Sequence, residues 1–497
     1  MTSHAIRPTR SEFLELAREG NFIPLQTDLV ADAETPVEAF RKLQGEGPCF
    51  LLESAETNDQ VGRYSLLGFE PVLLFTARGR SVEIREGGEV RVETVEDPLD
   101  RLRDEMRRFR CPVRSEYPFL GGAVGYLGYD MVRFFEPTVQ APPPDDLGLP
   151  DMVFLVPRVV LVFDHRYRRL RISVHAPVGE DPGAAYDAAE ARLRSVLDRL
   201  AKPVALRLLD ARADVAAPEA SSQTTREEFE ANVLRAQEYI RAGDAFQVVL
   251  SQRFQTPFAG DPLSLYRALR FVNPSPYMFC LELDGFALVG SSPEVHVRAV
   301  EGRVEIRPIA GTRRRGETPE QDAALAAELL ADPKECAEHI MLVDLARNDV
   351  GRIAEFESVK VTDLMIIERY SHVMHIVSNV VGRLRTGFDA YDVMRATFPA
   401  GTVSGSPKVR AMQIINELEK TKRCTYAGAV GYFGFDGNLD SCITLRTVAL
   451  KAGVAYVQAG AGVVADSTPE GEYRETVNKA MGMIRAIGIA AAAASEE

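Results

Sequence analysis

The sequence predicts an α+β fold in which large antiparallel β-sheets pack as a sandwich with helices on the outside. Region 48–176 consists mostly of short predicted strands separated by turn residues. The second half mixes strands with long helices, but its strands are not regularly followed by helices, as a doubly wound parallel sheet requires. The chain has 497 residues, of which 46% are hydrophobic, enough for two or three domains with a sizeable core.

In the first half, helices are predicted on either side of the strands. Residues 11–20 (SEFLELAREG) have the pattern of a short amphipathic helix that ends at Gly20. A second helix is expected after the strands, in AAYDAAEARLRSVLDRLA (184–201). The loop 141–150 (APPPDDLGLP) contains too much proline for either regular element.

A linker and a helix start mark the predicted domain boundary. Residues 210–224 are poor in large apolar residues, as linkers are. Thr225 and Glu228 then have the spacing of a capping box, which predicts the start of a helix in EEFEANVLRAQEYIRAGD. We therefore expect an N-terminal regulatory region over residues 1–220 and a catalytic domain over residues 221–497.

In the second half, strands and helices alternate irregularly. Strands are expected in FQVVLSQRF, FALVG, RVEIRPI and AYVQAGAGVV, and helices in PEQDAALAAELL, DPKECAEHIMLVDLARNDV and ETVNKAMGMIRAIG. One segment also recurs across the halves: GAVGYLGYD (122–130) and GAVGYFGFD (428–436) agree at seven of nine positions. Two glycine-rich strands that pack alike, or an old duplication of one sheet, would each explain this recurrence.

Composition excludes several classes of partner. The formal net charge of −14 argues against nucleic acid, whose binding depends on clustered Lys and Arg. No stretch approaches a transmembrane helix in length, and the start of the chain (MTSHAIRPTR) lacks the apolar region of a signal peptide. The six cysteines are scattered without CxxC pairs, as in reduced cytosolic proteins. We expect a cytoplasmic protein with no nucleic-acid partner and no membrane partner.

Two glutamate pairs have the spacing of a metal site. In Glu335-x-x-Glu338 and in Glu472-x-x-Glu475, both carboxylates share one face of a helix. Two such faces brought together would bind a hard divalent cation through oxygen ligands. A di-iron site would need Glu-x-x-His pairs, and the neighbouring His339 has the wrong spacing for one. Mg²⁺ is therefore the preferred cation, and two solvated helix faces are the alternative.

Three segments are candidates for binding an anion. The first is the predicted tight turn at Gly311 and Thr312, followed directly by arginines at 313–315. The second is QAGAG (458–462), predicted to be a turn whose backbone N–H groups form an anion nest. The third is Arg446, a lone Arg among alternating apolar residues, which needs a carboxylate partner. That partner would be either a ligand or a buried structural salt bridge.

The sequence resembles the chorismate-utilising enzymes, and within them the large components of anthranilate synthases. The resemblance extends from about Leu14 to Ile487. The motifs that carry it are GDAFQVVLSQRF (243–254), NPSPYMF (273–279), GSSPE (290–294), PIAGTRRRG (308–316), DPKECAEHIMLVDLARND (332–349), GTVSGSPK (401–408), YAGAVGY (426–432), QAGAGVVADS (458–467) and EGEYRETVNKA (470–480). This resemblance implies an α/β sandwich of antiparallel sheets wrapped by helices, in agreement with the fold class above.

The resemblance also implies the ligands of the site. Glu338 and Glu475 match the Mg²⁺ ligands of the family, with Glu335 and Glu472 as close or water-mediated partners. The residues that match the chorismate contacts are Gly311, Thr312, Tyr426, Arg446, Gly460, Ala461 and Gly462.

Further residues match catalytic roles of the family. Glu294 matches the acid that protonates the departing 4-hydroxyl, which requires burial to raise its pKa. His375 matches a residue that assists pyruvate loss and aromatisation. Gln247 stands where isochorismate-forming relatives carry a lysine base, and Ala310 where aminodeoxychorismate synthases commonly carry a nucleophilic lysine. The inert Ala310 leaves C2 open to ammonia.

The resemblance places a tryptophan inhibitor site in the first half. It involves strand residues 51–54 and the Pro-rich segment 273–279. Its expected contacts are Glu53, Ser54, Pro276, Tyr277 and Met278. Tyr277 and Met278 would flank the indole, and Glu53 with Ser54 would contact the ammonium group. An edge strand that meets an ordinary Pro-rich turn is the alternative.

Taken together, the resemblance implies a Mg²⁺-dependent lyase that converts chorismate and ammonia to anthranilate and pyruvate, the first committed step of tryptophan biosynthesis, with tryptophan as feedback inhibitor. None of the cysteines lies in a glycine-flanked strand-to-helix turn of the kind that activates a nucleophile. A separate glutamine amidotransferase subunit is therefore expected, in a heterotetramer of two large and two small subunits. The alternatives are another chorismate aminase (an aminodeoxyisochorismate or aminodeoxychorismate synthase) and a catalytically silent tryptophan sensor.

Overall fold

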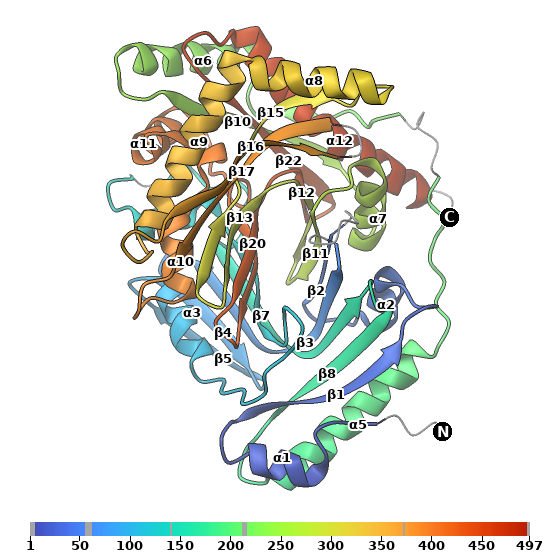
Figure 1. Ribbon diagram of the computed structural model, residues 1–497. Coiled ribbons are helices and arrows are strands. Elements are labelled where there is room, and N and C mark those ends of the chain that lie inside the picture. The colour runs from blue at the N-terminus through green and yellow to red at the C-terminus, as the bar shows by residue number, and fades with distance from the viewer. Residues whose placement is uncertain (1–4, 55–61, 140–141, 211–215, 371–372, 495–497) are drawn as a thin grey trace.

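A computed structural model describes residues 5–54, 62–139, 142–210, 216–370 and 373–494 (Figure 1). The elements of the N-terminal region are α1 (Arg10–Leu16), β1 (Phe22–Val30), α2 (Pro36–Leu43), β2 (Cys49–Glu53), β3 (Tyr64–Arg78), β4 (Ser81–Glu86), β5 (Glu89–Thr94), α3 (Pro98–Met106), β6 (Gly122–Leu127), η1 (Tyr129–Met131), α4 (Val132–Phe135), β7 (Met152–Asp164), β8 (Arg169–Pro177) and α5 (Pro182–Leu200).

The second half carries more strands and the longer helices. Its elements are β9 (Ser221–Ser222), α6 (Arg226–Arg241), β10 (Gln247–Pro257), α7 (Pro262–Val272), β11 (Tyr277–Leu283), β12 (Phe286–Ser292), β13 (Val295–Val300), β14 (Arg303–Ile306), β15 (Ile309–Arg314), α8 (Pro319–Ala331), α9 (Pro333–Gly351), β16 (Lys360–Arg369), β17 (Val373–Arg383), α10 (Ala390–Thr397), η2 (Gly401–Val403), β18 (Gly405–Ser406), α11 (Lys408–Leu418), β19 (Ala429–Gly434), β20 (Leu439–Ile443), β21 (Thr447–Lys451), β22 (Val454–Val463) and α12 (Pro469–Ala494).

Helix starts follow their capping residues. Thr225 accepts a hydrogen bond from the Glu228 backbone and Glu228 returns one, so the predicted capping box opens α6. Asp332 caps α9, with proline at the first helical position, where its missing N–H costs nothing. The helix predicted over 11–20 is shorter than expected: α1 ends at Leu16, and the chain continues to Gly20 as a turn. No helix in the described ranges is both long and apolar enough to cross a membrane.

The described strands form an antiparallel network, which confirms the α+β prediction. In the N-terminal region, β3 pairs with β7, β7 with β8 and β8 with β1. In the second half, β10 pairs with β22, β22 with β21 and β21 with β12. Helices α5, α9 and α12 lie on the outside of these sheets in Figure 1.

Two strand pairs join the halves of the chain. β2 lies beside β11, with Glu53 opposite Met278. β6 lies beside β19, so the two copies of the repeated segment are neighbours, with Gly125 opposite Gly431. A Cβ atom on either glycine would lie about 2 Å from a carbonyl of a third strand, so glycine allows that strand to approach. Gly125 and Gly431 are equivalent positions, and the pairs on either side of them, Val124 with Tyr432 and Tyr126 with Val430, interchange when the copies are exchanged. The two strands are therefore related by an approximate two-fold axis; duplication stays a hypothesis.

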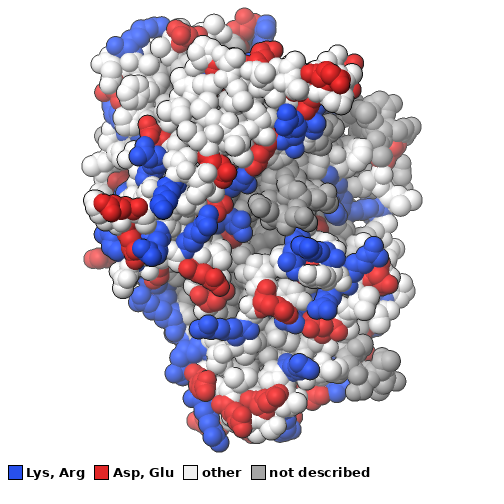
Figure 2. Space-filling view, in the orientation of Figure 1, with Lys and Arg blue, Asp and Glu red and all other residues white. Residues whose placement is uncertain are grey.

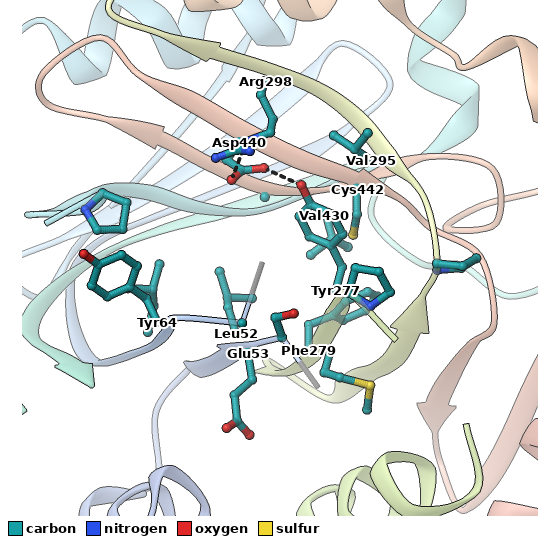
Figure 3. A pocket seen from close by; sticks show the side chains of 18 of the residues that line it. Leu52, Glu53, Tyr64, Tyr277, Phe279, Val295, Arg298, Val430, Asp440 and Cys442 are labelled. Carbon is teal, nitrogen blue, oxygen red and sulfur yellow. Dashed lines mark hydrogen bonds and ion pairs between the residues drawn. The ribbon is translucent and has the colours of Figure 1, made fainter. Parts of the chain in front are cut away.

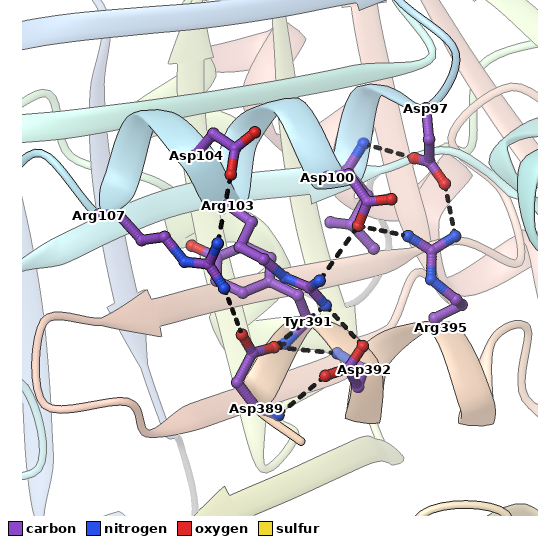
Figure 4. A network of polar contacts seen from close by, with 10 residues as sticks. Asp97, Asp100, Arg103, Asp104, Arg107, Asp389, Tyr391, Asp392 and Arg395 are labelled. Carbon is purple, nitrogen blue, oxygen red and sulfur yellow. Dashed lines mark hydrogen bonds and ion pairs between the residues drawn. The ribbon is translucent and has the colours of Figure 1, made fainter. Parts of the chain in front are cut away.

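Ion pairs between α3 and α10 add a third connection (Figure 4). Arg103 on α3 pairs with Asp392 on α10 at 2.6 Å. Arg395 on α10 pairs in return with Asp100 at 2.8 Å and with Asp97, the N-cap of α3. Across the face of the molecule shown in Figure 2, basic and acidic side chains are likewise interspersed. The predicted boundary near residue 220 stays a prediction, and part of the linker (211–215) lies outside the described residues.

Candidate active site

The predicted glycine-rich turn at 458–462 is a strand. Gly460, Ala461 and Gly462 lie within β22 and pair with Ser251, Leu250 and Val249 of β10. The turn prediction was wrong because pairing with β10, about 200 residues earlier in the chain, holds the segment extended. The expected nest of bare N–H groups is therefore replaced by a strand ladder.

The glycines of β22 instead make room for two side chains. A Cβ atom on Gly460 would lie 2.5 Å from the Tyr426 hydroxyl, and one on Gly462 would lie 2.6 Å from the Gln247 Nε2. Any larger residue would displace these side chains. The side chains of Tyr426 and Gln247 thus pack directly against the glycines of β22.

The segment around Gly311 and Thr312 is also a strand rather than a tight turn. It belongs to β15, where a bulge lies between Ala310 and Thr312 and Gly311 has a φ of 70°. The arginines that follow do not form an anion cradle. Arg313 pairs with Asp332 at 2.9 Å and Glu335 at 3.3 Å, and Arg315 pairs with Asp322 at 2.7 Å.

Both predicted glutamate pairs contribute to one acidic cluster. Glu338 on α9 accepts a hydrogen bond from Gln247 Nε2 at 3.1 Å. Burial raises the pKa of Glu338, and the negative charges of Glu335 and Glu475 raise it further. Burial likewise raises the pKa of Glu472, and Glu475 adds to the effect. The faces of α9 and α12 that carry the two pairs therefore lie within electrostatic range of each other, as the metal prediction requires.

The cluster suits a divalent cation that also has non-protein ligands. Its donors are carboxylate oxygens, which hard cations prefer, and their mutual repulsion is only partly offset. Lys479 is paired with Glu475 at 2.6 Å and donates to the Gly460 carbonyl at 3.0 Å. Within the described residues, no three His, Cys, Asp or Glu side chains form a ready metal cluster. A cation here would be held by few protein ligands and completed by substrate and water.

Glu294 is a buried acid beside two cations. It lies between β12 and β13, is 7% exposed, and accepts a hydrogen bond from the Thr402 hydroxyl at 2.6 Å. Burial raises its pKa to about 7, against the hydrogen bond from Thr402 and the positive charges of Lys479 and Arg446. Glu294 is therefore able to carry a proton near neutral pH, which is the property that an acid role requires.

Arg446 lies in a break between two strands. It separates β20 from β21 and has a φ of 46°, a left-handed conformation that is uncommon for an arginine. Among the described residues, no group forms a hydrogen bond or ion pair with its guanidinium; Glu294 is the carboxylate whose charge acts on it. The alternative of a buried structural salt bridge was wrong. An opening of about 560 Å³ is lined by Arg446 together with Glu475, Lys479 and Asn273.

His375 lies on β17, opposite Thr312 of β15. Its Nδ1 atom is 3.0 Å from the Gly311 carbonyl oxygen and 3.0 Å from the Thr312 hydroxyl. Because the carbonyl can only accept, Nδ1 carries the proton and Nε2 is left as an acceptor. Burial lowers the pKa of His375, and the positive charge of Arg446 lowers it further. The ring is thus neutral, with a basic nitrogen available for proton transfer.

Comparison with known proteins identifies the family. The model of the chorismate binding enzyme family matches residues 47–485. The chain belongs to the chorismate binding enzymes. It is 47% identical to the anthranilate synthase component 1 of Acetivibrio thermocellus, with 97% of this chain and 98% of that protein covered. It is 48% identical to the protein of that name from Aquifex aeolicus, with 96% and 97% covered.

Solved structures agree in fold. The crystal structure of anthranilate synthase component I from Streptococcus pneumoniae TIGR4 superposes with a TM-score of 0.76 at 40% identity, covering 92% of this chain and 99% of that chain. The menaquinone-specific isochorismate synthase MenF from Escherichia coli superposes with a TM-score of 0.72 at 20% identity, covering 96% and 98%, and shows the fold alone. The predicted family resemblance is therefore confirmed.

This chorismate binding enzyme also contains a cavity at the expected inhibitor position (Figure 3). The cavity has a volume of about 620 Å³, and all five residues of the predicted inhibitor site line it. Those residues are Glu53, Ser54, Pro276, Tyr277 and Met278. The cavity also has polar walls that were not predicted: Tyr277 donates to Asp440 at 2.9 Å, and Arg298 pairs with Asp440 at 3.2 Å.

Glu53 already has partners within the protein. Its carboxylate accepts hydrogen bonds from the hydroxyls of Ser65 and Tyr266, and Arg270 lies 3.9 Å away. In Figure 3 the Glu53 carboxylate points away from Tyr277 and Asp440. Each Glu53 carboxylate oxygen thus accepts one hydrogen bond within the protein and keeps a lone pair for a further donor, so its contact with a ligand ammonium group stays a prediction.

The sequence did not single out several residues that the structure brings to the site. Thr402, which bonds to Glu294, lies in GTVSGSPK, a motif noted only for the resemblance. Lys479 follows Glu475 by four positions, a spacing that would have predicted their ion pair on a helix. Asn273 gave no signal that distinguished it from an ordinary residue of a Pro-rich turn.

Proposed function

We propose that this chain converts chorismate and ammonia to anthranilate and pyruvate, as the aminating component of an anthranilate synthase. The observation that carries the proposal is that one site contains both an arginine and a carboxylate cluster whose charges nearby protein groups do not balance. Arg446 has no anionic partner among the described residues, while Glu338 lies in a cluster of excess negative charge. A substrate with two carboxylates satisfies both, one directly at Arg446 and one through a cation. Relatives that are 44–48% identical to this chain are named anthranilate synthase component 1, which supports the same reaction.

In this proposal Mg²⁺ is the cation, held by Glu338 and Glu475, with Glu335 and Glu472 as close partners. A cation held by these carboxylates would anchor a substrate carboxylate and neutralise part of its charge. The chain's own residues orient the remaining contacts. Gln247 holds Glu338 by a hydrogen bond of 3.1 Å, and the amide cannot take a proton from water.

Glu294 is the proposed general acid for the departing 4-hydroxyl. The Thr402 hydroxyl donates to Oε1, so the acid proton is carried by the other carboxyl oxygen. The nearby cations Arg446 and Lys479 stabilise the carboxylate that remains after the proton has been given up. Ammonia adds at C2, where Ala310 on β15 offers no competing nucleophile.

His375 is the proposed base of the second stage. Its Nδ1–H donates to the Gly311 carbonyl, which fixes the tautomer and leaves Nε2 to remove the C2 proton as the C3–O bond breaks. The enolpyruvate that leaves takes up a proton at its methylene carbon and becomes pyruvate. Gly311, Thr312, Tyr426, Gly460, Ala461 and Gly462 are proposed to contact chorismate along with Arg446.

The chain itself lacks an activated cysteine among its described residues. Burial raises the pKa of five cysteine thiols, the opposite of what a nucleophile needs; these are Cys49, Cys111, Cys280, Cys424 and Cys442. Cys336 lies on α9 and bonds to the Leu330 carbonyl. We therefore propose that a glutamine amidotransferase subunit supplies ammonia, in a cytoplasmic assembly of two large and two small subunits.

The 620 Å³ cavity is proposed to bind tryptophan as feedback inhibitor. Its walls combine the aromatic ring of Tyr277 and the proline at 276 with the polar pair of Arg298 and Asp440. An apolar ring with a zwitterionic end matches such a lining. Asp440 adds a second carboxylate to the lining beside Glu53 for the ammonium group.

The test uses the purified chain with chorismate, Mg²⁺ and ammonium salts at raised pH, where free ammonia is available. Anthranilate fluorescence should appear, and it should not appear with glutamine alone. Added amidotransferase subunit should restore glutamine use. Release of an aminated product that keeps the enolpyruvyl group would favour the alternative aminase reading, and no turnover with retained tryptophan binding would favour a sensor.

A further inference from the structure

One loop lines both the 620 Å³ cavity and the 560 Å³ opening. Asn273, at the end of α7, lines the 560 Å³ opening together with Arg446 and Glu475. Three residues further along the chain, Pro276 and Tyr277 line the 620 Å³ cavity. Prolines at 274 and 276 restrict the backbone between these points, so a displacement at one end is transmitted to the other.

Ser291 fastens this loop to the sheet. The residue is fully buried on β12, and its hydroxyl donates to the Asn273 carbonyl. The same hydroxyl accepts from the Asn273 side-chain amide at 2.9 Å and lies 2.9 Å from the Ser275 hydroxyl. The hydroxyl therefore bonds to both the backbone and the side chains of residues 273–275. Ser275 is itself 2% exposed, so water does not compete for these bonds.

The backbone of Ser291 fastens Arg446. The Ser291 N–H donates to the Arg446 carbonyl at 3.1 Å. Arg446 has a left-handed φ of 46°, a conformation that persists in an arginine only where surrounding bonds hold it. Side chain and backbone of one residue thus connect the loop of one cavity to the arginine of the other.

Ser291 also stands directly before the segment that carries the buried acid. Ser292 donates to the Ile443 carbonyl at 2.6 Å, Pro293 lines the larger cavity, and Glu294 faces Arg446 and Thr402. Residues 291–294 therefore connect a residue that lines the larger cavity, Pro293, to a carboxylate whose charge acts on Arg446, Glu294.

We propose that Ser291 is a positioning residue that couples occupancy of the larger cavity to the placement of Arg446. A ligand that shifts Pro276 and Tyr277 pulls on Asn273 and Ser275, and the Ser291 hydroxyl passes the shift to the Arg446 backbone. By linkage, a substrate at Arg446 opposes the shift to the same extent. The inference rests on the proposed function, because it takes tryptophan and chorismate as the two ligands.

The test compares wild type with Ser291→Ala, which removes the hydroxyl and keeps the N–H to Arg446. Ser173→Ala is the matched control: Ser173 is 1% exposed on β8 and bonds to Gln26 at 3.0 Å. Thermal melting checks the fold. Two quantities are measured: the tryptophan Kd by calorimetry, and the factor by which saturating tryptophan changes chorismate KM.

In Ser291→Ala we expect the tryptophan Kd to stay within about three-fold of wild type, while the effect of tryptophan on KM falls about ten-fold or to none. Ser173→Ala should match wild type in both. An unchanged effect on KM in Ser291→Ala overturns the proposal, and so does a parallel loss of tryptophan binding, which would make Ser291 part of the cavity wall. If tryptophan has no effect on the wild-type chain while anthranilate forms, both the coupling and the proposed tryptophan inhibition are wrong, and the proposed catalytic activity is retained.

A second variant keeps the test decisive if Ser291→Ala does not fold. Ser275→Ala removes the loop hydroxyl that bonds to Ser291 and leaves the bonds between Ser291 and Asn273 in place. It should weaken the effect of tryptophan on KM by a few-fold without changing its Kd. Full retention of the effect in a folded Ser275→Ala chain would contradict the coupling.

Discussion

The proposed active site and the 620 Å³ cavity differ in whether their charged side chains are paired within the protein. In the proposed active site, Arg446 has no anionic partner among the described residues and Glu338 lies among other carboxylates. In the larger cavity, Asp440 is held by Arg298 and Tyr277, and the Glu53 carboxylate is bonded to two hydroxyls. A site that must bind a dianion with a cation leaves charge unpaired, whereas the larger cavity already pairs its carboxylates within the protein.

The difference has consequences for substitution. Removing a carboxylate from a cluster of like charge relieves repulsion, so function is lost with little loss of stability. Removing one member of a paired set leaves a buried group without its partner, and stability suffers. The predictions below test this contrast, from the largest expected effect to the smallest.

Glu338→Ala should have the largest effect on activity. We expect kcat/KM with ammonia to fall by about a thousand-fold or more, because loss of a ligand weakens metal binding and a bound metal stabilises the charge of the transition state by several kcal/mol. The free energy of unfolding should change by less than about 1 kcal/mol, since repulsion with Glu335 and Glu475 is lost. Anthranilate fluorescence during a Mg²⁺ titration and urea unfolding measure the two quantities.

Asp344→Ala is the control for that variant. Asp344 lies on the same helix but pairs with Arg347 on the surface, so activity should be retained. Full activity in Glu338→Ala, or activity that EDTA does not reduce, would show that Glu338 is not a metal ligand.

Glu294→Gln should lower kcat by about a hundred- to ten-thousand-fold, the usual contribution of a general acid. The amide keeps the shape and can still accept from Thr402, but has no acid proton to give. In wild type, the pKa of about 7 means that the proton is present below pH 7 and lost above it. At a fixed concentration of free ammonia, kcat should therefore fall as pH rises through 7, and this fall should be absent from the variant. A pH-independent wild-type rate would refute the acid role.

Ser54→Phe should act on the other cavity alone. Ser54 lines the 620 Å³ cavity, which a phenyl ring would partly fill. The tryptophan concentration for half-inhibition should rise by about ten-fold or more, while the uninhibited rate stays within about two-fold, because the cavities are distinct. Inhibition curves with and without tryptophan measure both. Unchanged sensitivity would place the inhibitor elsewhere.

Gly462→Ala should have the smallest effect. The new Cβ would approach the Gln247 Nε2 to 2.6 Å, and the amide can move aside because it ends a flexible side chain. Its hydrogen bond to Glu338 would be lost, which should raise the Mg²⁺ requirement a few-fold with little change in unfolding free energy. A large loss of stability would contradict this prediction, because it would mean that neither β22 nor the Gln247 side chain can move to accommodate the new methyl group.

Several features could be predicted from local sequence because the physics that produces them is local. Helix geometry alone brings Glu335 and Glu338 to one face, and capping chemistry alone starts α6 at Thr225. The antiparallel α+β class followed from the order of strands and helices. The recurring GAVGY segment indicated that two strands share an environment, and they are neighbours.

Other features depended on residues far away in the chain. The QAGAG segment is extended because β10 pairs with it, and Arg313 is unavailable to an anion because acidic residues of α8 and α9 reach it. Among the residues that the structure describes, no group bonds to the Arg446 guanidinium, whereas the Glu53 carboxylate accepts a hydrogen bond from Tyr266, 213 positions later. Sequence periodicity reports which face of an element a residue occupies, so it determined the elements and the two glutamate pairs, whereas the roles of Glu294 and His375 came from the family resemblance. Whether a buried charge is already satisfied depends on which distant side chain packs against it, and only the tertiary structure decided that.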